Sequence, residues 1–223
     1  MNRKFLVLLT VGLLVGPLTA NATLLGPTQY LSSADSPFLP STGFTYFYLD
    51  DFEDGLLNTP GASASGPGVC MAGATCFVGS GLIDSVENGQ QGKDLWASGS
   101  ISFLFSAAVL GALPNAVGIV WTDGAGTIKF EAFDASNQSL GILTGNHADS
   151  TFTGGKAEDR FYGLTSLVGI ARIVISNTAG GIEVDHLQYG LQGDAPTAVP
   201  EPGTLALLAL GLAGLGLGRR RCV

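Results

Sequence analysis

Residues 116–133 read AVGIVWTDGAGTIKFEAF, and this stretch decides the fold class. Ala116–Trp121 is apolar throughout, which is typical of a strand buried on both faces. Asp123–Gly126 carries the turn residues of a hairpin, and Thr127–Phe133 then alternates apolar and polar residues. We therefore predict two antiparallel strands here. The inward-facing residues of the second are Ile128, Phe130 and Ala132.

Similar short segments repeat on both sides of this stretch at intervals of about ten residues. Cys70–Val78 is expected to be a short strand or a hooked loop, and the predicted strands are Gly43–Asp50, Ser100–Ser106, Gln138–Leu143, Phe161–Ser166, Val168–Ser176 and Gly181–Tyr189. The last two are expected to form a hairpin through Asn177–Gly180, and residues 23–42 are expected to be an irregular lead-in. Gly, Asp and Asn turns between short strands predict one all-β domain, an antiparallel β-sandwich of residues 23–190.

The charge of the chain excludes one class of partner. Of its ten basic and eighteen acidic residues, five basic residues and one acid belong to the two chain ends described below. The body keeps five basic and seventeen acidic side chains, a net charge of 5 − 17 = −12. Such a body repels the phosphates of nucleic acid, so we expect no nucleic-acid partner.

The N-terminal residues have the pattern of a secretory signal. Arg3 and Lys4 precede the apolar run Phe5–Val15, and Ala20-Asn21-Ala22 fits a cleavage site. We predict a signal peptide over residues 1–22 and export to an oxidising compartment. In that compartment Cys70 and Cys76, the two cysteines of the body, are expected to form a local disulfide.

The C-terminal end has three parts in a fixed order after a polar linker at residues 191–198. A Pro-flanked turn is followed by the uncharged apolar stretch 204–218, which predicts a transmembrane helix, and then by three arginines. Residues 199–223 closely resemble the PEP-CTERM sorting signal of Gram-negative bacteria. The resemblance implies recognition by the membrane protease-transpeptidase exosortase; the alternative is an ordinary single-span anchor. The matching residues are Val199, Pro200, Glu201, Pro202, Arg219, Arg220 and Arg221.

Two acidic stretches resemble the opening turn and closing strand of jelly-roll carbohydrate-binding modules. They are Asp50–Gly55 and Gly181–Leu187, with His186 standing where that pattern has a second aspartate. The resemblance implies a jelly-roll-like sandwich and a structural Ca²⁺ that ties the first strand to the last. Its candidate ligands are Asp51, Glu53, Asp54 and Asp185; the alternative is a solvated acidic turn.

The remaining candidates concern sugars and catalysis. Trp96 is flanked by polar residues and is the better candidate for an exposed, glycan-stacking ring, whereas Trp121 is expected in the core. Glu183 and Asp185 share a strand face, as a glycosidase pair requires, but such pairs are common. Neither His147 nor His186 has a Ser or Cys partner, and His186 is expected to share a face with Ile182 and Val184.

These observations favour a non-catalytic exported protein of the cell surface or the exopolysaccharide matrix, held in the inner membrane before processing. The alternative function is a calcium-stabilised carbohydrate-binding module, and the least favoured is a secreted glycoside hydrolase. The partners implied are exosortase, the membrane and polysaccharide, and the cofactor implied by the alternative is Ca²⁺.

Overall fold

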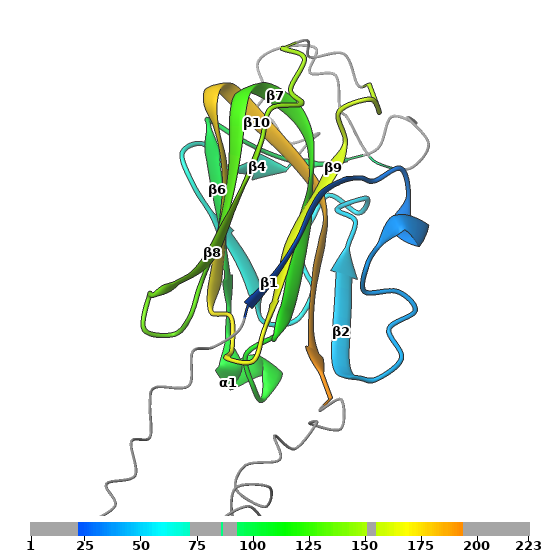
Figure 1. Cartoon of the computed structure of the whole chain (residues 1–223), viewed down its shortest axis with the longest axis vertical. Helices are drawn as coiled ribbons and strands as arrows, with labels where there is room; N and C mark the ends of the chain where they lie inside the picture. The colour runs from blue at the N-terminus through cyan, green and yellow to red at the C-terminus, as the bar shows by residue number, and fades with distance from the viewer. Residues whose placement is uncertain (1–21, 72–85, 87–92, 151–154, 194–223) are drawn as a thin grey trace, which may run out of the picture.

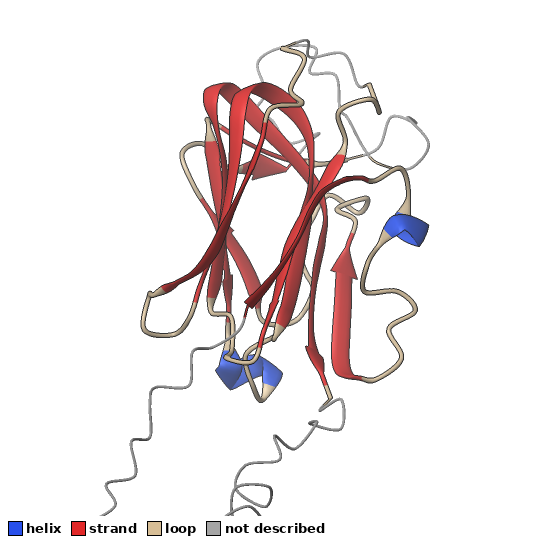
Figure 2. Cartoon of the chain, in the orientation of Figure 1, coloured by secondary structure: helices blue, strands red, loops and turns tan. Residues whose placement is uncertain are grey.

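The structure is a computed structural model that describes residues 22–71, 86, 93–150 and 155–193. Antiparallel strands dominate it (Figures 1 and 2). The strands are β1 (Ala22–Gln29), β2 (Phe44–Asp50), β3 (Ala62–Ser65), β4 (Cys70–Met71), β5 (Leu95–Ala97), β6 (Ser100–Phe105), β7 (Ala116–Phe133), β8 (Ser139–Gly145), β9 (Arg160–Ser166) and β10 (Arg172–Gln192). The short helices are a 3₁₀ turn at Ser33–Asp35 and α1 (Ala107–Leu110). The predicted all-β, antiparallel class is confirmed.

Strands β7 and β10 organise this sheet because they pair with each other along almost their whole length. The register runs from Arg172 opposite Phe133 to Gly190 opposite Ala116. Midway the pairing has several bulges, and both ribbons curve over one end of the molecule (Figure 1). Gly126 and Gly180, with φ of 87° and 71°, supply the left-handed backbone that this corner needs.

The two hairpins predicted at Asp123–Gly126 and Asn177–Gly180 are therefore wrong as turns between separate strands. The chain does reverse direction at both places, but β7 and β10 stay hydrogen-bonded to each other around the corner. Each strand then meets different neighbours on the two sides. The first half of β7 pairs β9 and its second half pairs β8, while β10 pairs β6 with its first half and β2 with its second.

The start of the domain also differs from the prediction. Residues 22–29 form β1 and pair antiparallel with β9, although residues 23–42 were expected to be irregular and Ala22 to end the signal peptide. The Gly26-Pro27 step that indicated a loop is accommodated by a register shift between Leu25 and Thr28. A proline is tolerated there because a bulge removes the need for its missing N–H.

Two groups of apolar side chains fill the interior. The larger includes Trp121, Phe130 and Tyr162, all fully buried, so the predicted core role of Trp121 is confirmed. The smaller lies against β9 and contains Tyr30, Phe38, Val86, Ala116, Val120 and Phe161. Ile128, Phe130 and Ala132 are all buried, as the alternation in 127–133 predicts.

Both ends of the described domain lie at the end opposite the corner (Figure 1). Ala22 at the start of β1 pairs with Ser166, whose N–H donates to the Asn115 carbonyl at 2.8 Å. The Asn115 side chain in turn brackets Gln192, accepting from its N–H at 2.7 Å and donating to its carbonyl at 3.1 Å. The chain therefore enters and leaves within a few residues of Asn115.

The predicted signal peptide, the linker beyond Gly193 and the apolar stretch 204–218 lie outside the described residues. Within the described part of the chain, none of the helices has the length and apolar character to span a bilayer.

Candidate functional site

The corner end of the sheet carries an unusual number of buried acids. Seven carboxyl side chains of the described residues are at most 7% exposed. Glu183 of β10 lies opposite Asp123 of β7, with Trp96 of β5 on its other side, so three neighbouring strands meet there. Burying an ionised carboxylate is costly unless hydrogen bonds or cations compensate it. The seven are Asp50, Asp94, Asp123, Glu158, Asp159, Glu183 and Asp185.

A bulge in β10 determines the positions of two candidate residues, Asp185 and His186. Asp185 lies opposite Val120 and Gln188 opposite Gly118, so His186 and Leu187 together face a single residue of β7. His186 takes a φ of 48°, the left-handed conformation that such a bulge can impose. Because the extra residue reverses the alternation, Leu187 joins Val184 in the larger core.

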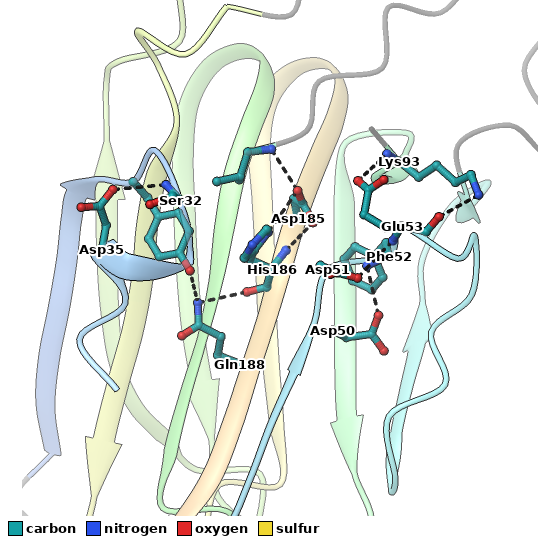
Figure 3. Close-up of polar contacts among 12 residues, drawn as sticks. Ser32, Asp35, Asp50, Asp51, Phe52, Glu53, Lys93, Asp185, His186 and Gln188 are labelled. Carbon is teal, nitrogen blue, oxygen red and sulfur yellow. Dashed lines mark hydrogen bonds and ion pairs between the residues drawn. The ribbon is translucent and has the colours of Figure 1, made fainter. Parts of the chain in front are cut away.

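The prediction that His186 shares a face with Ile182 and Val184 is accordingly wrong. Its ring is 1% exposed and meets Tyr30, of the smaller core, edge to face at a centroid distance of 5.5 Å. Gln188 follows it on the same side and donates to the Tyr30 hydroxyl at 2.9 Å (Figure 3). The Ser36 hydroxyl donates to the Gln188 amide oxygen, which makes a buried polar network.

Asp185 sits at the head of this bulge and has no exposed surface. Its Oδ1 accepts the His186 N–H at 2.6 Å, and its Oδ2 accepts the Val86 N–H at 3.0 Å and lies 3.2 Å from the His186 ring nitrogen Nδ1 (Figure 3). Burial raises the pKa of Asp185, while these hydrogen bonds and the imidazole act in the opposite direction. The carboxyl thus ties β10 to Val86.

A second set of titratable side chains lies beside β9. Glu158 accepts the N–H of Asp149 at 3.0 Å, and burial raises its pKa to about 7. His147 contacts the Tyr162 hydroxyl at 2.7 Å and packs edge to face on Trp121. Burial, followed by the nearby positive charge of Arg160, lowers the pKa of His147 to about 4. At neutral pH the imidazole is therefore uncharged.

The acidic run Asp50–Asp54 satisfies much of its hydrogen bonding within its own turn. One oxygen of Asp50 accepts the N–H of Phe52 at 3.2 Å (Figure 3). The other oxygen accepts from Asn58 and Thr59. Such carboxylate caps stabilise a tight turn without a cation. Glu53 contacts a residue distant in sequence, because its carboxylate accepts the Lys93 N–H at 2.9 Å.

The predicted calcium ligands do not form a common cage in the described structure. Asp51 and Asp54 are exposed and accept from the N–H groups of Glu53 and Leu56, whereas Asp185 is buried in β10. Among the described residues, no group of three or more His, Cys, Asp or Glu side chains is placed to hold a metal ion. Calcium binding by these four residues stays a prediction.

The other predicted site residues are half-buried, buried or outside the described residues. Trp96 lies in β5 and is half-buried, with its indole against the backbone of Gly181. Glu183 and Asp185, the pair considered for glycoside hydrolysis, are 7% and 0% exposed, so neither carboxyl is presented to solvent. Cys76 lies outside the described residues, so the disulfide with Cys70 stays a prediction.

The sequence reasoning missed Asp94, Glu158 and Asp159 as parts of this acidic end. Each stands directly before a strand, Asp94 before β5 and Glu158-Asp159 before β9.

Comparison with known protein families identifies one segment, which follows the all-β domain in the sequence. The model of the PEP-CTERM protein-sorting motif matches residues 198–221. The chain therefore carries a PEP-CTERM sorting motif at its C-terminal end, as predicted, which is consistent with an exosortase substrate. No curated protein matches the chain.

Among solved structures, the enzymatically active domain of tailspike protein 4 of bacteriophage CBA120 aligns with a TM-score of 0.32 and 15% identity. The alignment covers 64% of this chain and 20% of the tailspike chain, so the present chain spans about a fifth of that protein's length. No function follows from a similarity at this level.

Proposed function

We propose that this chain is a non-catalytic exported protein that exosortase sorts to the cell surface or the exopolysaccharide matrix. The observation that carries the proposal is the sorting motif at residues 198–221, directly behind the last strand of a folded domain. Before processing, the apolar stretch 204–218 holds the chain in the inner membrane, and the arginine cluster behind it stays on the cytoplasmic side.

The geometry of the domain supports display from a surface. Both ends of the domain leave near Asn115, so the attached tail lies at one end and the acidic corner faces away from it. The exposed acids Asp51, Glu53 and Asp54 favour solubility and repel other acidic polymers, so sugar recognition near them depends on aromatic rings and hydrogen bonds.

Mass spectrometry of the mature C-terminus tests the sorting step. In cells with exosortase, we expect a protein that ends near Pro200–Pro202, and in cells that lack exosortase an uncut chain that ends at Val223. A Glu201→Ala variant is expected to behave like the uncut chain, whereas Thr197→Ala, in the linker, is expected to be processed normally. Processing that is independent of exosortase contradicts the proposal.

The non-catalytic assignment rests on the burial of the acids that a hydrolase would use. A glycosidase needs two carboxyls that reach the scissile bond, whereas Glu183 and Asp185 are closed off by the strands around them. Incubation of the purified protein with polysaccharides is expected to release no reducing ends. Release that disappears in a Glu183→Gln variant overturns this assignment.

A second candidate is a calcium-stabilised carbohydrate-binding module. Its support is Trp96, which is partly exposed in β5 beside the acidic corner. Loss of binding to a glycan array on Trp96→Ala, with binding retained in Trp96→Phe, favours this candidate. Calcium is tested separately: a site occupied only in the folded state raises the melting temperature in millimolar Ca²⁺ over that in chelator. An unchanged melting temperature removes calcium.

A further inference from the structure

The end of the domain from which the tail leaves has exposed apolar side chains on two adjacent segments. Val109 of α1 is 64% exposed, and Leu167 in the β9–β10 loop is 84% exposed. The two segments are joined, since the Ile170 N–H donates to the Pro114 carbonyl at 2.8 Å. We call Val109, Leu167 and the neighbouring Val168 the apolar rim. Large apolar groups gathered on one surface indicate contact with apolar material.

An open cleft of about 310 Å³ lies beside this rim. Its lining includes Leu113, Leu167 and Leu191, and it ends at Gly193, the last described residue before the tail. The rim and the cleft therefore surround the place where the chain continues toward residues 204–218.

The charge of this end contrasts with that of the corner end. Residues 107–119, 161–171 and 187–193, which meet here, contain no Asp, Glu, Lys or Arg. Charged residues at the borders of these ranges include Arg160, Arg172, which lies over the Phe133 ring at 3.8 Å, and Asp50, which pairs with Leu187. The other six buried acids lie outside these ranges. A bilayer surface with anionic lipids repels carboxylates and tolerates a neutral, apolar face.

The length of the connecting chain keeps this end close to the membrane. Ten residues, 194–203, separate Gly193 from the apolar stretch, and even fully extended they span at most about 35 Å. Three of them are prolines, which limit the conformations of the connection. At so short a tether, even a weak contact forms readily because its effective concentration is high.

We infer that the apolar rim rests on the lipid bilayer that the chain's own tail enters, so that the domain is held against the inner membrane while it awaits processing. This inference rests on the proposed function, in which residues 204–218 span that membrane. The contact presents the domain in one orientation, with its acidic corner outward and its exit strand toward the processing enzyme.

Amide hydrogen exchange tests this contact in the chain that retains its tail, reconstituted in nanodiscs of phosphatidylethanolamine and phosphatidylglycerol. The perturbation is the double variant Val109→Ser with Leu167→Ser. We expect residues 107–111 and 166–169 to exchange about tenfold more slowly in the wild type than in this variant. A matched control is Leu56→Ser, which replaces a leucine of 57% exposure far from the rim and is expected to match the wild type.

The possible results separate the two proposals. Equal exchange in wild type and double variant, with the tail resistant to carbonate extraction, overturns the membrane contact alone. A chain that carbonate extracts overturns the membrane-held tail, and with it the proposed function. All the substituted side chains are exposed, so equal melting temperatures confirm that altered exchange does not come from altered folding. Slow exchange at the rim that the double variant abolishes supports the contact.

Discussion

Replacing Glu158 by Gln isolates the energetic effect of one buried acid at the corner end. The side chain is 3% exposed, accepts the Asp149 N–H at 3.0 Å, and has its pKa raised by burial from an ordinary 4.5 to about 7. Glutamine keeps the shape and an acceptor oxygen but has no proton to lose. The substitution therefore removes only the titration.

The sign of the effect follows from where the proton is bound. Between pH 4.5 and pH 7 the unfolded chain has lost this proton, whereas the folded protein still holds it. The stability that protonated Glu158 supplies is complete below pH 4.5 and is lost as the pH rises through 7. The whole shift corresponds to on the order of 3 kcal/mol, and water near the carboxylate reduces the expected loss to about 1–2 kcal/mol.

The stability that His147 supplies depends on pH in the opposite direction, so this contribution must cancel when the two proteins are compared. Its pKa is lowered to about 4, so the stability it supplies is present above pH 6.5 and is lost as the pH falls toward 4. Because His147 is present in both proteins, its contribution largely cancels in the difference between wild type and Glu158→Gln.

Urea unfolding followed by tryptophan fluorescence, at pH values from 4 to 8, measures that difference. We expect the Gln variant to gain about 1–2 kcal/mol relative to wild type between the acidic and the alkaline end. Glu131→Gln is the matched control with the opposite sign, because the hydrogen bond from Lys129 lowers the pKa of Glu131. A difference for Glu158→Gln that does not vary with pH refutes the reasoning.

Three further substitutions test the packing and hydrogen bonds of the fold, each by the free energy of unfolding. Gly118→Ala places a methyl group against the Phe161 ring and is expected to cost about 1–3 kcal/mol, whereas Gly155→Ala has open space and is expected to cost little; equal effects contradict the described packing. Asp50→Ala leaves several N–H groups of its turn without an acceptor, so a loss of about 1–3 kcal/mol is expected; no loss shows that water replaces the carboxylate. Gln188→Leu breaks a buried network with two hydroxyl groups and is expected to destabilise by about 1–3 kcal/mol; a neutral result argues against that network.

Local patterns predicted the strands that alternate along their length. Ser100–Ser106 became β6 with Ile101 and Phe103 buried, and the predicted strand Gln138–Leu143 corresponds to β8. The sorting motif was also predictable from the sequence, because it depends on the order of residue types rather than on tertiary contacts.

The corner of the sheet was not predictable from the same patterns. Gly-rich tetrads such as Asp123–Gly126 have the composition of a hairpin turn, and only the pairing of β7 with β10 reveals that the ladder continues through them. At the corner that pairing brings together residues more than fifty positions apart, such as Ala125 and Ala179, and no local window contains both.

The candidate site depended even more on distant contacts. Asp185 was singled out as a calcium ligand, whereas the structure pairs its carboxyl with the N–H of Val86, 99 positions earlier. His186 was assigned to the wrong face because a bulge after Asp185 reverses the strict alternation of a strand. Acids such as Glu158 carry no sequence mark of burial, since the same residue type is exposed in most proteins.

Attachment through β10 has a mechanical consequence. The strand that leads to the sorting tail is interior to the sheet, and its last residues are flanked by β2 on one side and β7 on the other. A pull on the anchored end therefore loads two rows of antiparallel hydrogen bonds in shear at once, rather than peeling an outer strand one bond at a time. Because the same strand continues around the corner, where it pairs with β5, β6 and the second half of β7, the strain is shared by strands on both sides of the corner.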